Sequence, residues 1–248
     1  MSDTLDQLLN LSHELGVESR QLAILGEGNT SARLDDDTFL VKASGSSLPT
    51  LAAGDVTRCR LRPLVDLLDC GDLDDAAVTQ ALLDSRVDAS AKKPSVEAMF
   101  HAYLLTLPDV RFVAHCHPIS VNAILCSPRA GDFANRRLFP DEIVCCGKRS
   151  ALVPYVDPGV PLARAIRDAV GAMQGEVPRV VLLANHGLVG LGATAAGALA
   201  AVRMADKSAQ IFLAAAAMGG PIFLSDADVR RIEGRDDEAY RRRALGVA

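Results

Sequence analysis

The sequence of 248 residues has no excess of basic residues, no long hydrophobic run and no CxxC motif. Its formal net charge is −5, which argues against a nucleic-acid-binding surface and against binding to an anionic membrane. A small anionic substrate is still compatible with this charge, because a local pocket can be positive on an acidic protein. The longest apolar stretch, from Ile211 to Leu224, is broken by Gly-Gly-Pro and is shorter than the roughly 20 residues that span a bilayer. We therefore expect no nucleic-acid partner and no membrane segment.

A secretory signal and a disulfide framework are also missing. The first residues, MSDTLDQLLNLSHEL, are acidic and polar, where a signal peptide needs a basic start and an apolar run. The six cysteines lack the spacing of a secreted scaffold, and a chain of this length needs no disulfides for its stability. We expect a cytoplasmic protein with reduced thiols, most of them in the core. The cysteines are Cys59, Cys70, Cys116, Cys126, Cys145 and Cys146.

The hydrophobic pattern predicts strands mixed irregularly with helices. Leucines at helical spacing predict a helix over residues 4–15 that ends at Gly16. The stretches LAILGEGNTSARL and TFLVKASGSSL predict a β-hairpin. Further helices are expected over 95–105, 119–125, 159–173, 193–218 and 226–245, and strands over 110–115, 179–184 and within 142–153. The chain contains no internal repeat or linker, so we expect one α/β or α+β domain over residues 1–248, with three layers.

The motif AHCHPIS places His115 and His117 two residues apart behind an apolar run. Side chains alternate along a β-strand, so both imidazoles should point to one face and Cys116 to the other. Two imidazoles on one face can bind the same metal ion. The alternative is one core histidine with its hydrogen bonds satisfied and one incidental histidine. We interpret the pair as metal ligands.

Two more residues are candidates for the same site. His186, in NHGLVGLG, follows the buried strand VVLLA in a loop of the kind on which sites are built, although it could be a turn residue without a role. Glu97 lies near the start of a helix behind Pro94, one turn before His101. It could be a ligand or a general acid/base, or could only complement the helix dipole. We interpret His101 as mainly structural, supporting Glu97 or a backbone group.

The histidines and the Gly/Ser-rich turns indicate two kinds of ligand, a metal ion and an anion. Three histidines suit zinc, while Mn²⁺, Co²⁺ or Fe²⁺ can use the same ligands. Three protein ligands also leave a position open for substrate, as in catalytic sites. The turns GEGNTS and KASGSS are rich in donors and can bind a phosphate or carboxylate, unless they are only loops. Asn29, Ser44 and Gly45 are suited to this role, and the helix start at Ser95 adds a further terminus that favours anions.

The motifs GNTSAR, KASGSSL, KPSVEAMFHAYL, AHCHPISVNAIL and LLANHGLVGLG occur in this order and resemble the class II aldolase/adducin family. The resemblance extends from Leu5 to Met218. It implies a three-layer α/β/α sandwich with a mainly antiparallel central sheet. It also implies a homotetramer with active sites at subunit interfaces, and a divalent metal, with zinc first.

The family contains sugar-phosphate aldolases, a 4-epimerase, a dehydratase and decarboxylases. The resemblance therefore implies a metal-dependent lyase of carbohydrate metabolism that cleaves a C–C bond of a sugar phosphate or related hydroxy-carbonyl compound through a metal-stabilised enediolate. The alternatives are a decarboxylase, 4-epimerase or dehydratase, and a non-catalytic module like the adducin head, which should lack the metal ligands. The residues implied by motif are the metal ligands His115, His117 and His186, the acid/base Glu97, and the phosphate-site residues Asn29, Ser44, Gly45 and Ser95.

Two features depart from the pattern of sugar-phosphate aldolases. The motif before the acid usually carries two consecutive hydroxyl residues, whereas this chain reads SVE. The region after the two histidines often supplies a tyrosine to a neighbouring subunit, whereas LFPDEIVCC has none. Tyr155 and Tyr240 are the substitutes that the chain offers. Lys42, or the pair Lys92 and Lys93, could replace the lost phosphate contact, or could be solvated charges.

Overall fold

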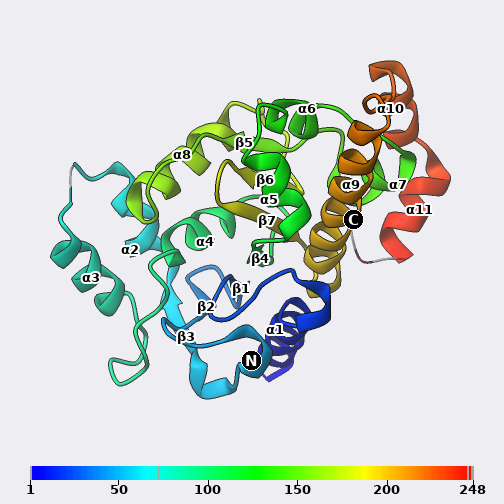
Figure 1. Cartoon of the computed structure of the whole chain (residues 1–248). Coiled ribbons are helices and arrows are strands. Elements are labelled where there is room, and N and C mark those ends of the chain that lie inside the picture. Colours follow the sequence, from blue (N-terminus) through cyan, green and yellow to red (C-terminus); the bar gives the residue numbers. More distant parts are fainter. Residues whose placement is uncertain (1, 72, 245, 247–248) are drawn as a thin grey trace.

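A seven-stranded sheet forms the centre of the computed structural model, which describes residues 2–71, 73–244 and 246 (Figure 1). The strands are β1 (Asn29–Arg33), β2 (Thr38–Lys42), β3 (Val56–Arg60), β4 (Phe112–Cys116), β5 (Ala151–Val153), β6 (Val180–Leu183) and β7 (Gly187–Gly192). Their order across the sheet is β3-β2-β1-β4-β7-β6-β5. Neighbouring strands are antiparallel apart from β5 and β6, which are parallel. The expected mainly antiparallel sheet is therefore confirmed.

Helices cover both faces of this sheet, which gives the three layers expected. One face is covered by α1 (Ser2–Leu15), α5 (Ile119–Leu125), α6 (Ala130–Asn135), α7 (Pro140–Cys146) and α9 (Ala195–Ala217). The other face is covered by α2 (Leu61–Asp66), α4 (Ala98–Leu104) and α8 (Val160–Gly171). Outside these layers lie α3 (Asp75–Asp84), α10 (Asp226–Glu233) and α11 (Asp236–Ala244) (Figure 1). Short 3₁₀ turns are η1 (Glu18–Arg20), η2 (Leu48–Thr50), η3 (Ala53–Asp55) and η4 (Leu67–Asp69).

Strand β4 divides its side chains between two hydrophobic cores. Phe112, Ala114 and Cys116 belong to the core under α9, while Val113 belongs to the core under α4 and α8. His115 lies on the side of Val113, because side chains alternate along a strand. The prediction that Cys116 points away from the histidines is thus confirmed. Burial also raises the pKa of the Cys116 thiol, which makes it an inert core residue.

The long helix α9 lies unusually close to β7. A Cβ atom on Gly190 would lie 2.7 Å from a methyl of Val202, and one on Gly192 would lie 2.4 Å from the backbone nitrogen of Ala198. Glycine on the strand and alanine on the helix therefore let the two backbones approach. This close contact stabilises the strand next to β4.

Two predicted elements are confirmed only in part. The segment 142–153, expected to contain strands, forms the helix α7 and only the short strand β5. Pro140 occupies the first turn of α7, where its missing N–H costs nothing, and Glu142 accepts a hydrogen bond from the Leu138 N–H at 2.7 Å. The single helix expected over 226–245 is two helices separated at Gly234, and its last residue, Leu245, lies outside the described residues.

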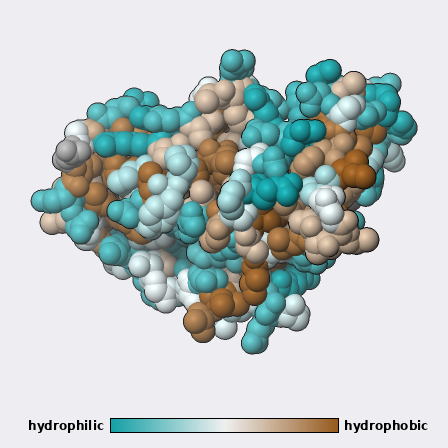
Figure 2. Space-filling view, turned by 45° about the horizontal axis from the view of Figure 1, so that its top comes forward, coloured by the Kyte–Doolittle hydropathy of each residue, from teal (hydrophilic) through white to brown (hydrophobic). Residues whose placement is uncertain are grey.

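Among residues 2–71, 73–244 and 246, no helix is both long and apolar enough to cross a membrane. On the face shown in Figure 2, hydrophobic side chains alternate with hydrophilic ones over short distances. Four of the six cysteines are buried, as expected, while Cys70 and Cys126 are exposed.

Candidate metal site and active site

Three histidines from separate segments lie together at one end of the sheet. His115 is in β4, His117 follows it directly, and His186 lies in the turn between β6 and β7. One ring nitrogen from each lies within 4.8 Å of the others, and the ring centroids are 4.8 to 5.0 Å apart. The Nε2 atoms of His115 and His117 are separated by 3.0 Å. The structure therefore brings together the three residues that the sequence indicated.

The pairing of β4 with β7 explains this convergence. The register sets Cys116 opposite Leu188, so the turn that holds His186 lies beside the end of β4. A Cβ atom on Gly187 would lie 2.6 Å from the Cys116 carbonyl oxygen, so only glycine permits this approach. The left-handed backbone of the turn occurs at Asn185, with φ of 55°, a conformation that asparagine tolerates.

The histidines are neutral and oriented for binding a cation. The Nδ1–H of His115 donates to the Leu188 carbonyl at 2.9 Å, which leaves its Nε2 lone pair free. Burial, reinforced by His186, lowers the pKa of His115 to about 3. Burial and the neighbouring His115 lower the pKa of His117 to about 4, and burial also lowers the pKa of His186. Neutral imidazole is the form that ligates metals, so these residues fit a divalent cation.

The Glu97 carboxylate faces two of the three histidines. Its Oε2 lies 3.5 Å from the Nε2 of His115, and its Oε1 lies 3.5 Å from the Nε2 of His186. Glu97 is the N-cap residue of α4 and is 9% exposed. Helix α4 was expected to begin at Ser95 and begins at Ala98, which places Glu97 at the helix entrance. A carboxylate in this position can complete a ligand set or exchange a proton with a bound substrate.

A buried hydrogen-bonded chain holds Glu97. The Ser31 hydroxyl and the Nδ1 of His101 are 2.7 Å apart, and the Nε2 of His101 bonds Asn29 Oδ1. Because this amide oxygen can only accept, the His101 proton is on Nε2 and Ser31 donates to Nδ1. The Asn29 amide then donates to Glu97 Oε2 at 2.5 Å. His101 is buried, which lowers its pKa well below the usual value. It thus supports Asn29, and through Asn29 it supports Glu97.

The residues predicted for a phosphate site lie on adjoining turns. The amide of Asn29 is 3.4 Å from the Ser95 hydroxyl. The turn holding Ser44 and Gly45 follows β2, and the Ser44 N–H donates to the Lys93 carbonyl at 2.9 Å. The Ser95 N–H donates in turn to the Lys42 carbonyl at 3.2 Å. Strand β1 and two neighbouring turns therefore carry the four residues predicted for the phosphate site, which are Asn29, Ser44, Gly45 and Ser95.

The sequence did not predict that the Lys42 side chain is buried. It is 4% exposed, so the interpretation as a solvated charge was wrong for this lysine. Burial lowers its pKa, and the negative charge of Glu97 partly offsets that shift. In contrast, Lys92 is on the surface and pairs with Asp55 at 2.6 Å. The available signal was the place of Lys42 at the end of the strand TFLVK, in which all five residues are buried.

The segment expected to supply a tyrosine forms α7 and packs against α9. Figure 1 shows α7 beside α11, away from α4. Tyr155 is 59% exposed and its hydroxyl bonds Asp157, while Tyr240 is 70% exposed on α11. Neither hydroxyl is hydrogen-bonded to the histidine cluster.

A three-layer α/β/α fold with three neutral histidines and a facing carboxylate defines a class of protein with a site for a divalent cation. The family model described as Class II Aldolase and Adducin N-terminal domain matches residues 6–213. The chain belongs to this family. Class II aldolases depend on a divalent metal, and the histidine triad can hold one.

Similar proteins include enzymes of known reaction. The chain is 29% identical over 220 residues to 3-oxo-tetronate 4-phosphate decarboxylase of Haemophilus influenzae. This match covers 87% of this chain and 90% of that enzyme. It is 29% identical over 197 residues to an uncharacterized oxidoreductase, YuxG, of Bacillus subtilis (strain 168), covering 76% of this chain but only 26% of YuxG. A solved structure of L-fuculose 1-phosphate aldolase matches with a TM-score of 0.73 and 21% identity, over 94% of this chain and 95% of that chain. The chain is a class II aldolase-like enzyme.

Proposed function

We propose that the chain is a metal-dependent lyase that breaks a C–C bond next to a ketone in a phosphorylated, sugar-derived substrate. The observation that supports this proposal is the position of the Glu97 carboxylate, 3.5 Å from nitrogens of both His115 and His186. His115, His117 and His186 would hold the divalent ion. Such an ion acts as a Lewis acid toward a carbonyl group and stabilises negative charge that develops there.

The protein residues then orient the substrate and move a proton. Glu97 would deliver a proton to, or remove one from, the carbon next to the ketone. Asn29 holds one carboxylate oxygen of Glu97, which leaves the other oxygen available to the substrate. We assign the substrate phosphate to the Gly45 amide and to the hydroxyls of Ser44 and Ser95, with Asn29 at their edge.

Decarboxylation is a second candidate reaction, and two observations favour it over aldol cleavage. The relative from H. influenzae that matches over 90% of its length is a decarboxylase. Aldol cleavage also needs a group that removes a hydroxyl proton, and the segment LFPDEIVCC, where the resemblance expects a tyrosine for the neighbouring subunit, contains none. Loss of CO₂ from a 3-oxo acid leaves a carbanion next to the ketone and needs only one proton, returned to that carbon. In this proposal Glu97 would return it.

Three finer properties belong to the same proposal. We propose zinc as the metal, because three imidazoles and an open position are typical of catalytic zinc. We propose a homotetramer with active sites between subunits, located in the cytoplasm. Elemental analysis of the purified protein tests the metal, and light scattering tests the assembly.

The reaction can be tested with two substrates. The chain loaded with Zn²⁺ is incubated with 3-oxo-tetronate 4-phosphate or with L-fuculose 1-phosphate, and the release of CO₂ and of aldehyde is measured. We expect CO₂ and dihydroxyacetone phosphate from the first substrate. The variant His115→Ala, which removes a metal ligand, should release neither product. Aldehyde without CO₂ would identify an aldolase, and no turnover by a protein that binds Zn²⁺ would refute the proposal for these substrates.

A further inference from the structure

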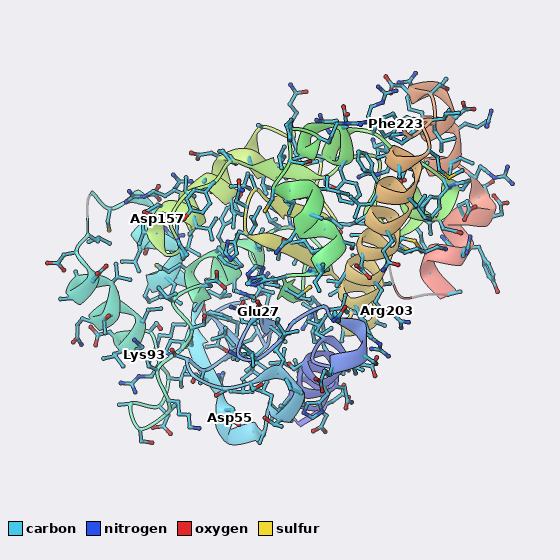
Figure 3. The ribbon with its side chains drawn as sticks, in the orientation of Figure 1. Glu27, Asp55, Lys93, Asp157, Arg203 and Phe223 are labelled. Carbon is cyan, nitrogen blue, oxygen red and sulfur yellow. The ribbon has the colours of Figure 1, made fainter. Side chains whose placement is uncertain are left out.

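The motif GEGNTS places a second carboxylate, Glu27, beside the histidine cluster. Its Oε1 lies 3.7 Å from the Nδ1 of His117, and its Oε2 accepts a hydrogen bond from the Ile24 N–H at 3.0 Å. The first contact is on the side of the imidazole away from Nε2, the atom that faces His115. Figure 3 shows Glu27 near the centre of the molecule. Glu27 therefore faces a metal ligand without facing the metal position.

The backbone explains why Glu27 is held there. The segment before β1 lies against the end of β4, because the His117 N–H donates to the Leu22 carbonyl at 2.8 Å. A Cβ atom on Gly28 would lie 2.6 Å from the His115 carbonyl oxygen, and Gly28 has a left-handed φ of 71°. Only glycine satisfies both conditions, so residue 27 is fixed next to His117. The hydrogen bond to Ile24 fixes the carboxylate within its turn.

The histidine ligands differ in what their second nitrogen meets. The Nδ1 of His115 donates to a neutral backbone carbonyl, that of Leu188. The Nδ1 of His117 instead faces a carboxylate. A carboxylate behind a metal-bound imidazole keeps the proton on the far nitrogen, fixes the ring orientation and raises the basicity of the ligating nitrogen. His117 is also the more exposed of the two, with 20% of its side chain accessible against 1% for His115, so it has less packing to fix its ring.

The geometry points to Glu27 as a positioning residue that holds His117 in the tautomer with a free Nε2 and thereby strengthens the binding of a divalent cation. This inference rests on the proposed metal site. It assigns no contact between Glu27 and the substrate. Its effect is on the affinity of the cation and acts through His117.

The variant Glu27→Gln separates this role from a structural one. Glutamine keeps a carbonyl oxygen for the Ile24 N–H, but presents an amide donor to the Nδ1–H of His117, where a donor cannot pair. A groove of about 400 Å³ borders Glu27, His117 and Ile119, so the substitution disturbs no packed core. Glu18→Gln is the matched control, because Glu18 is an exposed residue of the preceding turn and its substitution removes the same charge.

The measurement is the affinity for Zn²⁺ alone, by competition with a chromophoric chelator. We expect Glu27→Gln to bind Zn²⁺ roughly 10- to 100-fold more weakly than the unchanged protein, and Glu18→Gln to bind it equally well. The thermal unfolding temperature of the metal-free Glu27→Gln protein should be unchanged. In the Zn²⁺-loaded unchanged protein, nitrogen NMR should show His117 protonated at Nδ1.

The outcomes separate this inference from the proposed function. Equal Zn²⁺ affinity in Glu27→Gln and the unchanged protein would overturn the role of Glu27 and leave the metal site intact. An equal loss in Glu18→Gln would also overturn it, by showing a general charge effect, as would a lower unfolding temperature of metal-free Glu27→Gln, by showing a structural role. Absence of Zn²⁺ binding in the unchanged protein would refute the metal site itself.

Discussion

The two sides of the histidine cluster are built differently. On one side, a buried polar chain runs from Ser31 through His101 and Asn29 to Glu97, and each of these residues is 9% exposed or less. On the other side, His117 borders an open groove with the exposed side chain of Ile119. Buried hydrogen-bonded networks are rigid because an unpaired member is costly. The buried side thus fixes the Glu97 carboxylate, and the open side contains the groove next to His117.

The largest effect expected on the buried side comes from Glu97→Gln. Glutamine fills the same volume but cannot exchange a proton, so kcat should fall by about 10²- to 10⁴-fold. The variant should retain most of its Zn²⁺, because the three histidines remain. Steady-state kinetics together with elemental analysis check both parts. Turnover at the original rate would remove Glu97 from its role in proton transfer.

The pH dependence of stability tests how strongly the buried side excludes charge. Burial lowers the pKa of His101 well below 6.5, and the pKa of His115 to about 3. Between these values and pH 6.5 the unfolded chain binds more protons than the folded chain, so stability falls as pH decreases. Each such histidine removes up to about 1.4 kcal/mol per pH unit below pH 6.5. Urea unfolding of the metal-free protein from pH 7.5 to 4.5 measures this slope, and a smaller slope is expected in His101→Phe.

The variant His101→Phe itself interrupts the buried chain. Phenylalanine keeps the ring but leaves Asn29 Oδ1 and the Ser31 hydroxyl without this partner. The free energy of unfolding at pH 7.5 should fall by about 1–3 kcal/mol, the cost of an unsatisfied buried polar group. The kcat should also fall while KM changes little, because Glu97 loses its orientation. A change in stability with unchanged kcat would show that the chain only supports the fold.

Local patterns in the sequence predicted the parts of the site that depend on neighbouring residues. The spacing of His115 and His117 follows from strand alternation alone, and the NHG turn marked His186. The buried chain depends instead on long-range register. Asn29 is opposite His115 in the pairing of β1 with β4, and it bonds His101, 72 positions further along the chain. No local period encodes such a distance.

The elements that differ from the prediction, in segment 142–153 and at the start of α4, also depend on contacts that a local pattern does not contain. The apolar residues of segment 142–153 suit a strand or a helix, and Pro140 with its capping contacts determined the helix. The helix start at Ala98 was also missed, because residues 94–95 are extended against β2 and its following turn, through the bridge between Ala43 and Pro94. Tertiary pairing thus overrode a local helix signal, and that pairing placed Glu97 at the helix entrance.

The smallest effect expected concerns the departure at the motif SVE, directly before Glu97. Val96 is 43% exposed and occupies the position where sugar-phosphate aldolases carry a second hydroxyl residue. Val96→Ser should add one hydrogen bond to a substrate phosphate, worth about 1 kcal/mol, and lower KM about fivefold. The kcat should stay unchanged, because Glu97 and the buried chain are untouched. Val96→Ala serves as the control for lost apolar volume. An equal decrease of KM in both variants would show that the effect comes from removing the bulk of the valine side chain. An increase in KM for Val96→Ser alone would show that the substrate phosphate does not bind next to residue 96.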